Sequence, residues 1–225
     1  MAATGVVGPH NHTFHSDGEL LPAEFIRRAE VAGLAGVALT DHVDASNVEA
    51  VVLALKRACD SERKHGKLLC AAGVEITHVR PSEIAELVHR AYSLGAEWVV
   101  VHGETPVEPV EPGTNRAAIE AGCDLLAHPG YIDGELARLA AEKGVLLEIS
   151  GRKGHSLANG HVARTGRDAG AKVVFGGDWH DAGDISGPEP IRGVLLGAGL
   201  SEAEAEAALA TAREALSSRG ALHSG

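Results

Sequence analysis

Residues 6–18 read Val-Val-Gly-Pro-His-Asn-His-Thr-Phe-His-Ser-Asp-Gly, a short apolar run that leads directly into histidines and an aspartate. Side chains two positions apart on a strand point the same way, so His10 and His12 can present two imidazoles to one ion. The pair Asp17 and Gly18 is typical of a turn. Imidazole is a common ligand of transition-metal ions. The stretch therefore predicts a strand with a metal-binding end, provided that other strands end in similar residues.

The length of 225 residues and the apolar content of 44% suit one α/β domain over residues 1–225. Aromatic residues make up only 3%, so valine, leucine and alanine must fill the core. The net charge of −11 gives no general attraction for phosphate backbones and disfavours nucleic acid partners. The three cysteines lack metal-binding spacing and are expected to be buried apolar side chains. Without a membrane-length apolar stretch or a signal pattern, we expect a cytoplasmic protein with no membrane partner.

Short apolar runs alternate with amphipathic helices, which is typical of parallel β/α units. The predicted strands are residues 6–10, 36–42, 68–75, 98–102, 125–128, 145–149 and 172–176. Gly193–Leu196 is a weak candidate for another, Asn115 is expected to cap a short helix, and Ser201 with Glu204 forms a capping box for a last helix. The pattern predicts an α/β fold, a distorted (β/α)7 TIM-like barrel with a C-terminal helix. An open doubly wound sheet is the alternative.

A residue of metal-ligand type stands at the C-terminal end of each predicted strand. These residues are His10, His12, Asp41, His42, Glu75, His102, His128, Glu148, Asp178 and His180. In a β/α barrel the C-terminal strand ends meet at one mouth, where active sites lie. Burying so many imidazoles and carboxylates together is costly unless a cation compensates them. Nitrogen and oxygen donors in this number predict two or three divalent ions of zinc, manganese or iron.

The chain resembles the PHP (polymerase and histidinol phosphatase) superfamily of metal-dependent phosphoesterases, and is most similar to its histidinol-phosphatase-like single-domain members. The matching motifs are His10-x-His12-Thr13-x-x-Ser16-Asp17-Gly18, Thr40-Asp41-His42, Gly73-Val74-Glu75, the solitary His128 before Pro-Gly, and Asp178-x-His180. They occur in order between residues 8 and 182. The resemblance implies a distorted (β/α)7 barrel, in agreement with the strand pattern.

The resemblance also implies three ion sites. The implied ligands are His10, His12, Glu75 and Asp178 for the first ion, Glu75, His102 and His128 for the second, and Asp17, His42 and His180 for the third. Glu75 would bridge the first two ions. His15 is the alternative to Asp17, because some members place a histidine where this chain has Gly18. Asp41 is interpreted as a residue that orients a ligand histidine.

Further residues are candidates for contact with the substrate. Arg152 follows the sixth strand, where some histidinol-phosphatase-like members bind phosphate, and a guanidinium fork matches phosphate oxygens; a solvated loop charge is the alternative. Lys153 is its neighbour, and His155 could protonate a leaving group or be a loop residue. Trp179 departs from the usual Ser-Asp-Ala-His motif and could stack on a ring or close the pocket wall. Glu148 could orient a ligand or meet a substrate amine.

We therefore expect hydrolysis of a small phosphomonoester, similar to histidinol phosphate or a nucleotide, with Glu75, Asp178 and Arg152 as catalytic residues. A PHP-type exonuclease or nucleotide phosphodiesterase is the nearest alternative, although a nuclease needs a basic groove. An amidohydrolase-type enzyme also begins with His-x-His on a barrel. By resemblance, members of that class typically place a bridging lysine at a strand end, and no predicted strand here ends in one. A non-catalytic metal-binding domain is the remaining alternative.

Overall fold

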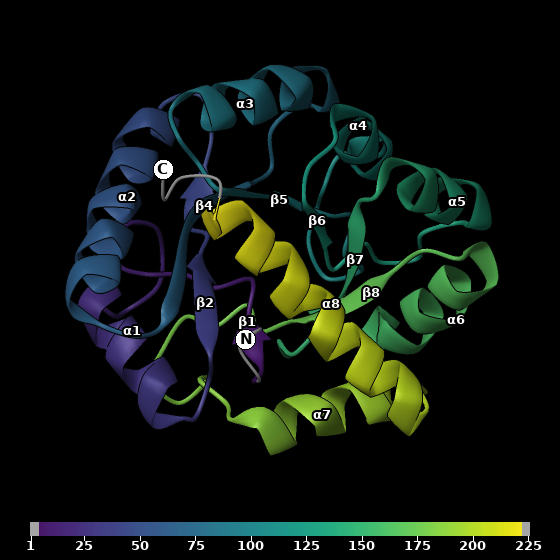
Figure 1. The fold of residues 1–225 in the computed structure, drawn as a ribbon. Coiled ribbons are helices and arrows are strands. Elements are labelled where there is room, and N and C mark those ends of the chain that lie inside the picture. The colour runs from purple at the N-terminus through teal and green to yellow at the C-terminus, as the bar shows by residue number, and fades with distance from the viewer. Residues whose placement is uncertain (1–4, 222–225) are drawn as a thin grey trace.

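A computed structural model describes residues 5–221, in which parallel strands form a nearly closed barrel with helices between them (Figure 1). The strands are β1 (Val7–Gly8), β2 (Gly36–Leu39), β3 (His42–Val43), β4 (Leu69–Ile76), β5 (Trp98–His102), β6 (Leu125–Ala127), β7 (Leu146–Ser150) and β8 (Val173–Gly176). The helices are α1 (Pro22–Val31), α2 (Val48–His65), α3 (Pro81–Ser93), α4 (Thr114–Ala121), α5 (Gly134–Lys143), the 3-10 turn η1 (His155–Ala158), α6 (Asn159–Ala169), α7 (Pro188–Gly197) and α8 (Glu202–Ala221).

The strand order β1-β2-β4-β5-β6-β7-β8 confirms the predicted seven-stranded TIM-like barrel with its C-terminal helix, and the open sheet was the wrong alternative. β2 and β3 both pair in parallel with β4, so they are two parts of one predicted strand. Asn11 and Trp179 form a parallel bridge between the residues that follow β1 and β8. The His12 N–H donates to the Trp179 carbonyl and the Asp178 N–H to the His10 carbonyl, both at 2.9 Å. The bonds that bring the barrel near closure therefore involve the predicted metal ligands.

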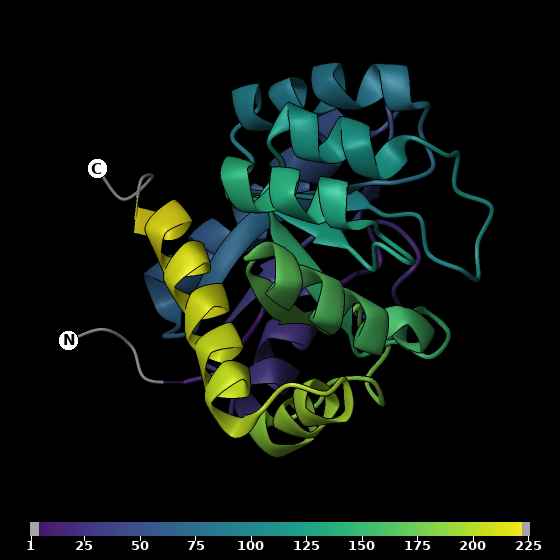
Figure 2. The same ribbon diagram turned by 90° about the vertical axis from the view of Figure 1, so that its right-hand side faces the viewer.

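The inside of the barrel is a packed core rather than a pore. Ala38 and Ala71 contribute small side chains to a cluster that also contains the large Trp98, which is almost fully buried. Ala212 and Leu216 of α8 join the same cluster, so α8 closes the N-terminal end of the barrel. Figure 2 shows α8 on one side of the molecule and a long loop between β5 and α4 extending on the other. The C-terminal end is thereby left as the mouth of the barrel.

The candidate strand Gly193–Leu196 was wrong, because these residues lie in α7. Pro188 occupies the first turn of α7, where its fixed φ favours a helix, and Leu195 is among the residues buried on the inner face. The capping box before α8 is confirmed. The Ser201 N–H donates to the Glu204 carboxylate at 2.7 Å, and the Glu204 N–H donates to Ser201 Oγ at 3.3 Å.

Asn115 does not cap α4, as the sequence suggested. The helix begins two residues earlier than such a cap implies, at Thr114 after Gly113, whose φ of 98° suits glycine. The Asn115 side chain instead accepts a hydrogen bond from the Glu104 N–H and donates one to the Pro129 carbonyl, both at 2.9 Å. It therefore ties together the loops that follow β5 and β6.

The three cysteines, Cys59, Cys70 and Cys123, are free thiols and all are buried, as expected for apolar filling residues. Within residues 5–221, no helix has the length and apolar character needed to cross a membrane.

Candidate metal centre

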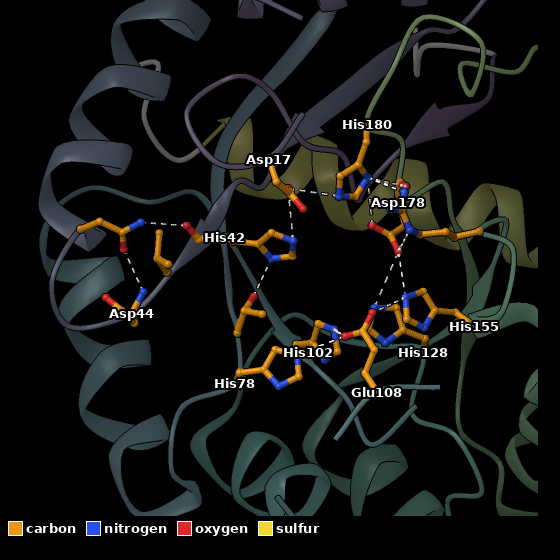
Figure 3. A pocket seen from close by; sticks show the side chains of 14 residues that line it. Asp17, His42, Asp44, His78, His102, Glu108, His128, His155, Asp178 and His180 are labelled. Carbon is orange, nitrogen blue, oxygen red and sulfur yellow. Dashed lines mark hydrogen bonds and ion pairs between the residues drawn. The ribbon is translucent and has the colours of Figure 1, made fainter. Parts of the chain in front are cut away.

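Six of the nine predicted metal ligands, Asp17, His42, His102, His128, Asp178 and His180, line a cavity of about 380 Å³ at the mouth of the barrel (Figure 3). The other three, His10, His12 and Glu75, are fully buried beside them. The nine ligands are described below as an inner cluster (His10, His12, Glu75, Asp178), an outer cluster (Asp17, His42, His180) and a lateral cluster (His102 and His128, with His155 beside them). Figure 3 shows the outer cluster and the lateral cluster on opposite sides of the cavity.

In the inner cluster, two imidazole nitrogens face two carboxylates. His10 Nε2 lies 3.1 Å from His12 Nε2 and 3.4 Å from Glu75 Oε1. His12 Nε2 lies 3.2 Å from Asp178 Oδ1. All four residues are buried, and the groups near the Glu75 oxygens are histidine nitrogens, including His42 Nδ1 at 2.8 Å from Oε2. A buried carboxylate surrounded by imidazole nitrogens fits a bound cation.

The charges of the inner cluster suit such an ion. Burial opposes ionisation of Glu75, but His10 and His42 outweigh it and hold the pKa of this carboxyl well below its usual range. Burial likewise opposes ionisation of Asp178, but His10 outweighs it and holds the pKa of this carboxyl well below its usual range. Burial lowers the pKa of His12 to about 4, so its imidazole is neutral near pH 7. Ionised carboxylates and a neutral imidazole are the forms that bind metal.

Glu148 contacts His10 on the side of the ring that faces away from the inner cluster. Its Oε2 accepts a hydrogen bond from His10 Nδ1 at 2.6 Å, and both side chains are fully buried. Burial lowers the pKa of His10, but Glu148 and its neighbours outweigh this and raise it well above the usual value. Because Nδ1 donates to Glu148, Nε2 faces the inner cluster, where an ion would replace its proton. Glu148 therefore orients a candidate ligand, and its buried position leaves it out of reach of a substrate amine.

The outer cluster is the part of the centre that is open to solvent. Asp17 Oδ1 lies 3.2 Å from His180 Nε2 and 3.4 Å from His42 Nε2, and the Asp17 side chain is 57% exposed. Burial opposes ionisation of Asp17, but the two histidines outweigh it and hold its pKa well below the usual range. His15, the alternative to Asp17, instead packs against Phe14 with ring centroids 4.2 Å apart.

Asp41 does not orient a histidine, contrary to the interpretation from the sequence. Its carboxylate accepts hydrogen bonds from the Thr13 N–H, Thr13 Oγ1 and Ser16 Oγ, each at 2.7 Å. Successive side chains of an extended segment point in opposite directions, so Asp41 faces away from the ring of His42. Asp41 thus stabilises the turn that carries Asp17.

The lateral cluster lies on the other side of Glu75. His128 Nε2 is 3.6 Å from Glu75 Oε1, and the His128 ring stacks on His155 at a centroid distance of 4.0 Å. His102 Nδ1 lies 3.2 Å from a backbone carbonyl and His155 Nδ1 lies 2.7 Å from Thr105 Oγ1, so both rings can direct Nε2 into the cluster. Candidate ligand atoms of the three histidines lie within 4.8 Å of one another. His155 is thereby placed as a further candidate ligand.

Arg152 lies at the edge of the cavity. Its Nη1 donates to the Asp178 carbonyl at 3.1 Å and lies 2.7 Å from His180 Nδ1. His180 Nδ1 is also 2.9 Å from the Asp178 carbonyl. Arg152 can only donate, so at this distance His180 Nδ1 accepts a hydrogen bond from its guanidinium. His180 Nε2 is directed at Asp17, 3.2 Å away.

Trp179 and Lys153 lie in different environments. Trp179 is 3% exposed and packs near Phe25 and Phe175, with ring centroids 6.4 and 6.1 Å away. It packs into the hydrophobic core and presents little surface on which a ligand could stack. Lys153 is exposed beside Arg152.

No family model matches the sequence, but a curated protein is similar to it over most of its length. Over 199 residues the chain is 44% identical to the uncharacterized protein MJ1295 of Methanocaldococcus jannaschii, and the match covers 88% of this chain and 91% of that protein. The chain belongs to the MJ1295 family.

Solved hydrolase structures share the barrel of this MJ1295-family chain. An amidohydrolase is 16% identical with a TM-score of 0.61, and the match covers 96% of this chain and 74% of that one. A candidate histidinol phosphatase from Listeria monocytogenes is 10% identical with a TM-score of 0.57, covering 80% of this chain and 97% of that one. At these identities the comparison shows a common TIM-like fold.

In this MJ1295-family chain, backbone strain is concentrated at the candidate metal centre. Among residues 5–221, the non-glycine residues with positive φ are His78 (54°), His128 (26°) and Asp178 (51°). Such conformations cost about 1–3 kcal/mol each and persist where surrounding structure enforces them, often at functional sites. Two of the three are predicted ligands, and His78 lies next to the lateral cluster, its ring centroid 4.7 Å from that of His102.

Glu108 is the site residue that the sequence did not single out. It lies on the loop between β5 and α4, and its carboxylate contacts both His78 and His102. No strand-end pattern marks this position. Its one sequence signal is its place in a loop that directly follows a strand ending in a candidate ligand.

Proposed function

We propose that this chain is a metal-dependent phosphatase of the PHP superfamily, a single-domain enzyme that hydrolyses a small phosphomonoester. The observation that carries the proposal is the position of Arg152 beside three clusters of candidate ligands on one cavity. A guanidinium matches the oxygens of a phosphate group, and metal ions bind the same oxygens. The MJ1295 relative has no described activity, so the proposal rests on the geometry of the site and the resemblance of its motifs.

Glu75 has the central role in the proposed site. Its Oε1 lies 3.4 Å from His10 Nε2 and 3.6 Å from His128 Nε2, so one carboxylate can serve the inner and the lateral cluster. Asp178 similarly lies between His12 and His128, at 3.2 and 3.9 Å. Bound zinc, manganese or iron ions, two or three in number, would supply Lewis acidity that polarises a phosphoryl oxygen and lowers the pKa of water.

The chain's own side chains would orient the phosphate. The Nη1 bond to the Asp178 carbonyl fixes the Arg152 guanidinium, while 35% of its side chain remains exposed at the cavity. Lys153 adds a second positive charge beside it. His155 Nε2 lies 3.7 Å from Asp178 Oδ2 and, with Nδ1 at Thr105, would hold an ion in the lateral cluster rather than contact the phosphate. Negative charge that develops on the phosphoryl oxygens would meet groups already in position.

Amide hydrolysis is the second candidate, because the amidohydrolase structure shares the barrel with a TM-score of 0.61. The cavity formed by the described residues has Arg152 in its lining and no lysine to act as a bridging ligand. This composition favours phosphate over amide substrates. A nuclease is disfavoured by the net charge of −11 and by the carboxylates around the mouth.

The test is phosphate release from phosphomonoesters, nucleotides and short oligonucleotides, measured on metal-stripped protein with manganese, zinc or iron added back. Turnover of one small monoester, lost on stripping and restored by metal, is the expected result. Release from oligonucleotides alone would favour the nuclease. No release from any of these, together with hydrolysis of an amide, would contradict the phosphatase proposal.

A further inference from the structure

The loop between β5 and α4, residues 103–113, places a carboxylate at the lateral cluster. This loop extends from the barrel on the side away from α8 (Figure 2), and Figure 3 shows the Glu108 side chain among the histidines of the cavity. Glu108 Oε2 lies 3.0 Å from His102 Nε2 and 3.1 Å from His78 Nε2. Its Oε1 lies 3.5 Å from His155 Nε2. One carboxylate therefore contacts three imidazoles.

The contact with His102 identifies where Glu108 sits relative to a bound ion. His102 Nδ1 is directed at the Gly103 carbonyl, so Nε2 is the atom left for a metal. Glu108 Oε2 faces this same atom, and a cation at the lateral cluster would lie within reach of the carboxylate. That cation could be surrounded entirely by protein atoms, supplied by Glu75, His128, His155 and Glu108. A catalytic ion, in contrast, needs an open position for its substrate.

The loop is fixed at its base and open at its tip. Glu104 Oε1 accepts hydrogen bonds from the Gly113 and Asn115 N–H groups at 3.0 and 2.9 Å, which closes the base. Residues 106–109 at the tip are exposed, and the Glu108 side chain itself is 37% exposed. His78, at the rim, is 40% exposed and offers Glu108 a partner outside the lateral cluster. Glu108 can therefore leave His102 without unfolding the loop.

We propose that Glu108 is a displaceable ligand of the lateral metal site. Its carboxylate occupies the place of the substrate phosphate until the phosphate binds. The inference rests on the phosphatase function proposed above. A phosphate oxygen and a carboxylate oxygen are both anionic donors, and two of them at one position repel each other. Phosphate therefore binds only as Glu108 withdraws toward His78. His155 stays with His102 and His128, because its Nδ1 is held by Thr105.

The test compares Glu108→Gln with the matched variant Glu111→Gln, on manganese-loaded protein titrated with inorganic phosphate in a calorimeter. Glu111 is on the same loop but pairs with Arg80 at 2.7 Å, outside the cavity. If the Glu108 carboxylate occupies the site about nine-tenths of the time, its removal should tighten phosphate binding about tenfold. We expect this gain in Glu108→Gln, an unchanged affinity in Glu111→Gln, and the wild-type number of bound ions in both, counted by native mass spectrometry.

Three other results would overturn the inference, and they separate it from the function. Equal phosphate affinity in wild type and Glu108→Gln would show that Glu108 does not compete, and would leave the phosphatase proposal in place. A lost ion in Glu108→Gln would make Glu108 a permanent ligand, again without affecting the function. Absence of phosphate binding in wild type and variant, with all ions bound, would overturn both proposals.

Discussion

The inner and outer clusters share one mouth but are built in different ways. The inner cluster combines residues that follow β1 and β8, where the barrel nears closure, with Glu75 of β4. It is buried, and neighbouring histidines hold its carboxylates in the ionised form. The outer cluster depends on a turn that Asp41 stabilises, and Asp17 at its centre is 57% exposed. The strand ends thus make the inner cluster rigid, while the turn leaves the outer cluster accessible to solvent and substrate. We expect the inner cluster to control metal binding and catalysis as a whole, and the outer cluster to affect the substrate with little effect on the fold.

Glu75→Ala should have the largest effect. It removes the carboxylate that lies between the inner and lateral clusters and leaves Asp178, at 3.8 and 3.9 Å, as the carboxylate shared by His10 and His128. We expect turnover to fall by about a thousandfold or more, together with a loss of bound metal. Steady-state kinetics and metal analysis on the same preparation check this, with Glu86→Ala on the exposed face of α3 as the control. Activity similar to wild type would refute the bridging role.

Glu148→Gln tests whether the inner cluster depends on the residue behind it. The variant keeps the size of the side chain but removes the charge that holds His10 at 2.6 Å. Loss of such a supporting partner typically costs about 10–100-fold in metal affinity. Calorimetric titration of metal-stripped protein with manganese checks this. An unchanged affinity would mean that His10 is oriented by the backbone alone.

Arg152→Ala tests a residue that lies between the inner and outer clusters, since Arg152 contacts both Asp178 and His180. We expect kcat/KM for a phosphomonoester to fall about tenfold or more, about 1.4 kcal/mol. Arg152→Lys should not restore it, because an ammonium lacks the planar fork. If Arg152→Ala keeps the wild-type kcat/KM, the residue is a surface charge.

Asp17→Asn should have the smallest effect on the fold. Because the side chain is more than half exposed, we expect the free energy of unfolding to change by less than about 0.5 kcal/mol. The variant should nevertheless bind one ion fewer, since Asp17 lies between His42 and His180. Chemical denaturation and metal counting measure the two quantities. A large loss of stability would show that the outer cluster is as structural as the inner one.

The sequence could predict the parts of this molecule that depend on local pattern. Buried parallel strands appear as continuous apolar runs, so their ends, and the histidines and carboxylates at those ends, could be located without a structure. The helices α1 and α3 begin at Pro22 and Pro81, and the fixed φ of proline suits the first turn of a helix, so such starts are of the kind that a local pattern can mark. Gly193–Leu196 was misread because a short apolar run has no period that separates a strand from a buried helix face.

The parts that depend on long-range contact could not be predicted. Asp41 bonds to Thr13 and Ser16, far away in sequence, and only the pairing of the strands brings them together. Trp179 is buried in the core, where Phe25 and Phe175 pack near it. Glu108 reaches the histidines from a loop whose path no pattern specifies. A single sequence carries no signal for such contacts between residues that are distant along the chain.

The central claim is that these strand ends form a metal centre with more than one ion, joined by Glu75. The most direct measurement is the number of ions per chain in reloaded wild-type protein and in Glu75→Ala, counted by native mass spectrometry. The account predicts two or three ions in wild type and a clear loss in the variant. One ion or none in wild type, or the same number in both proteins, would contradict it.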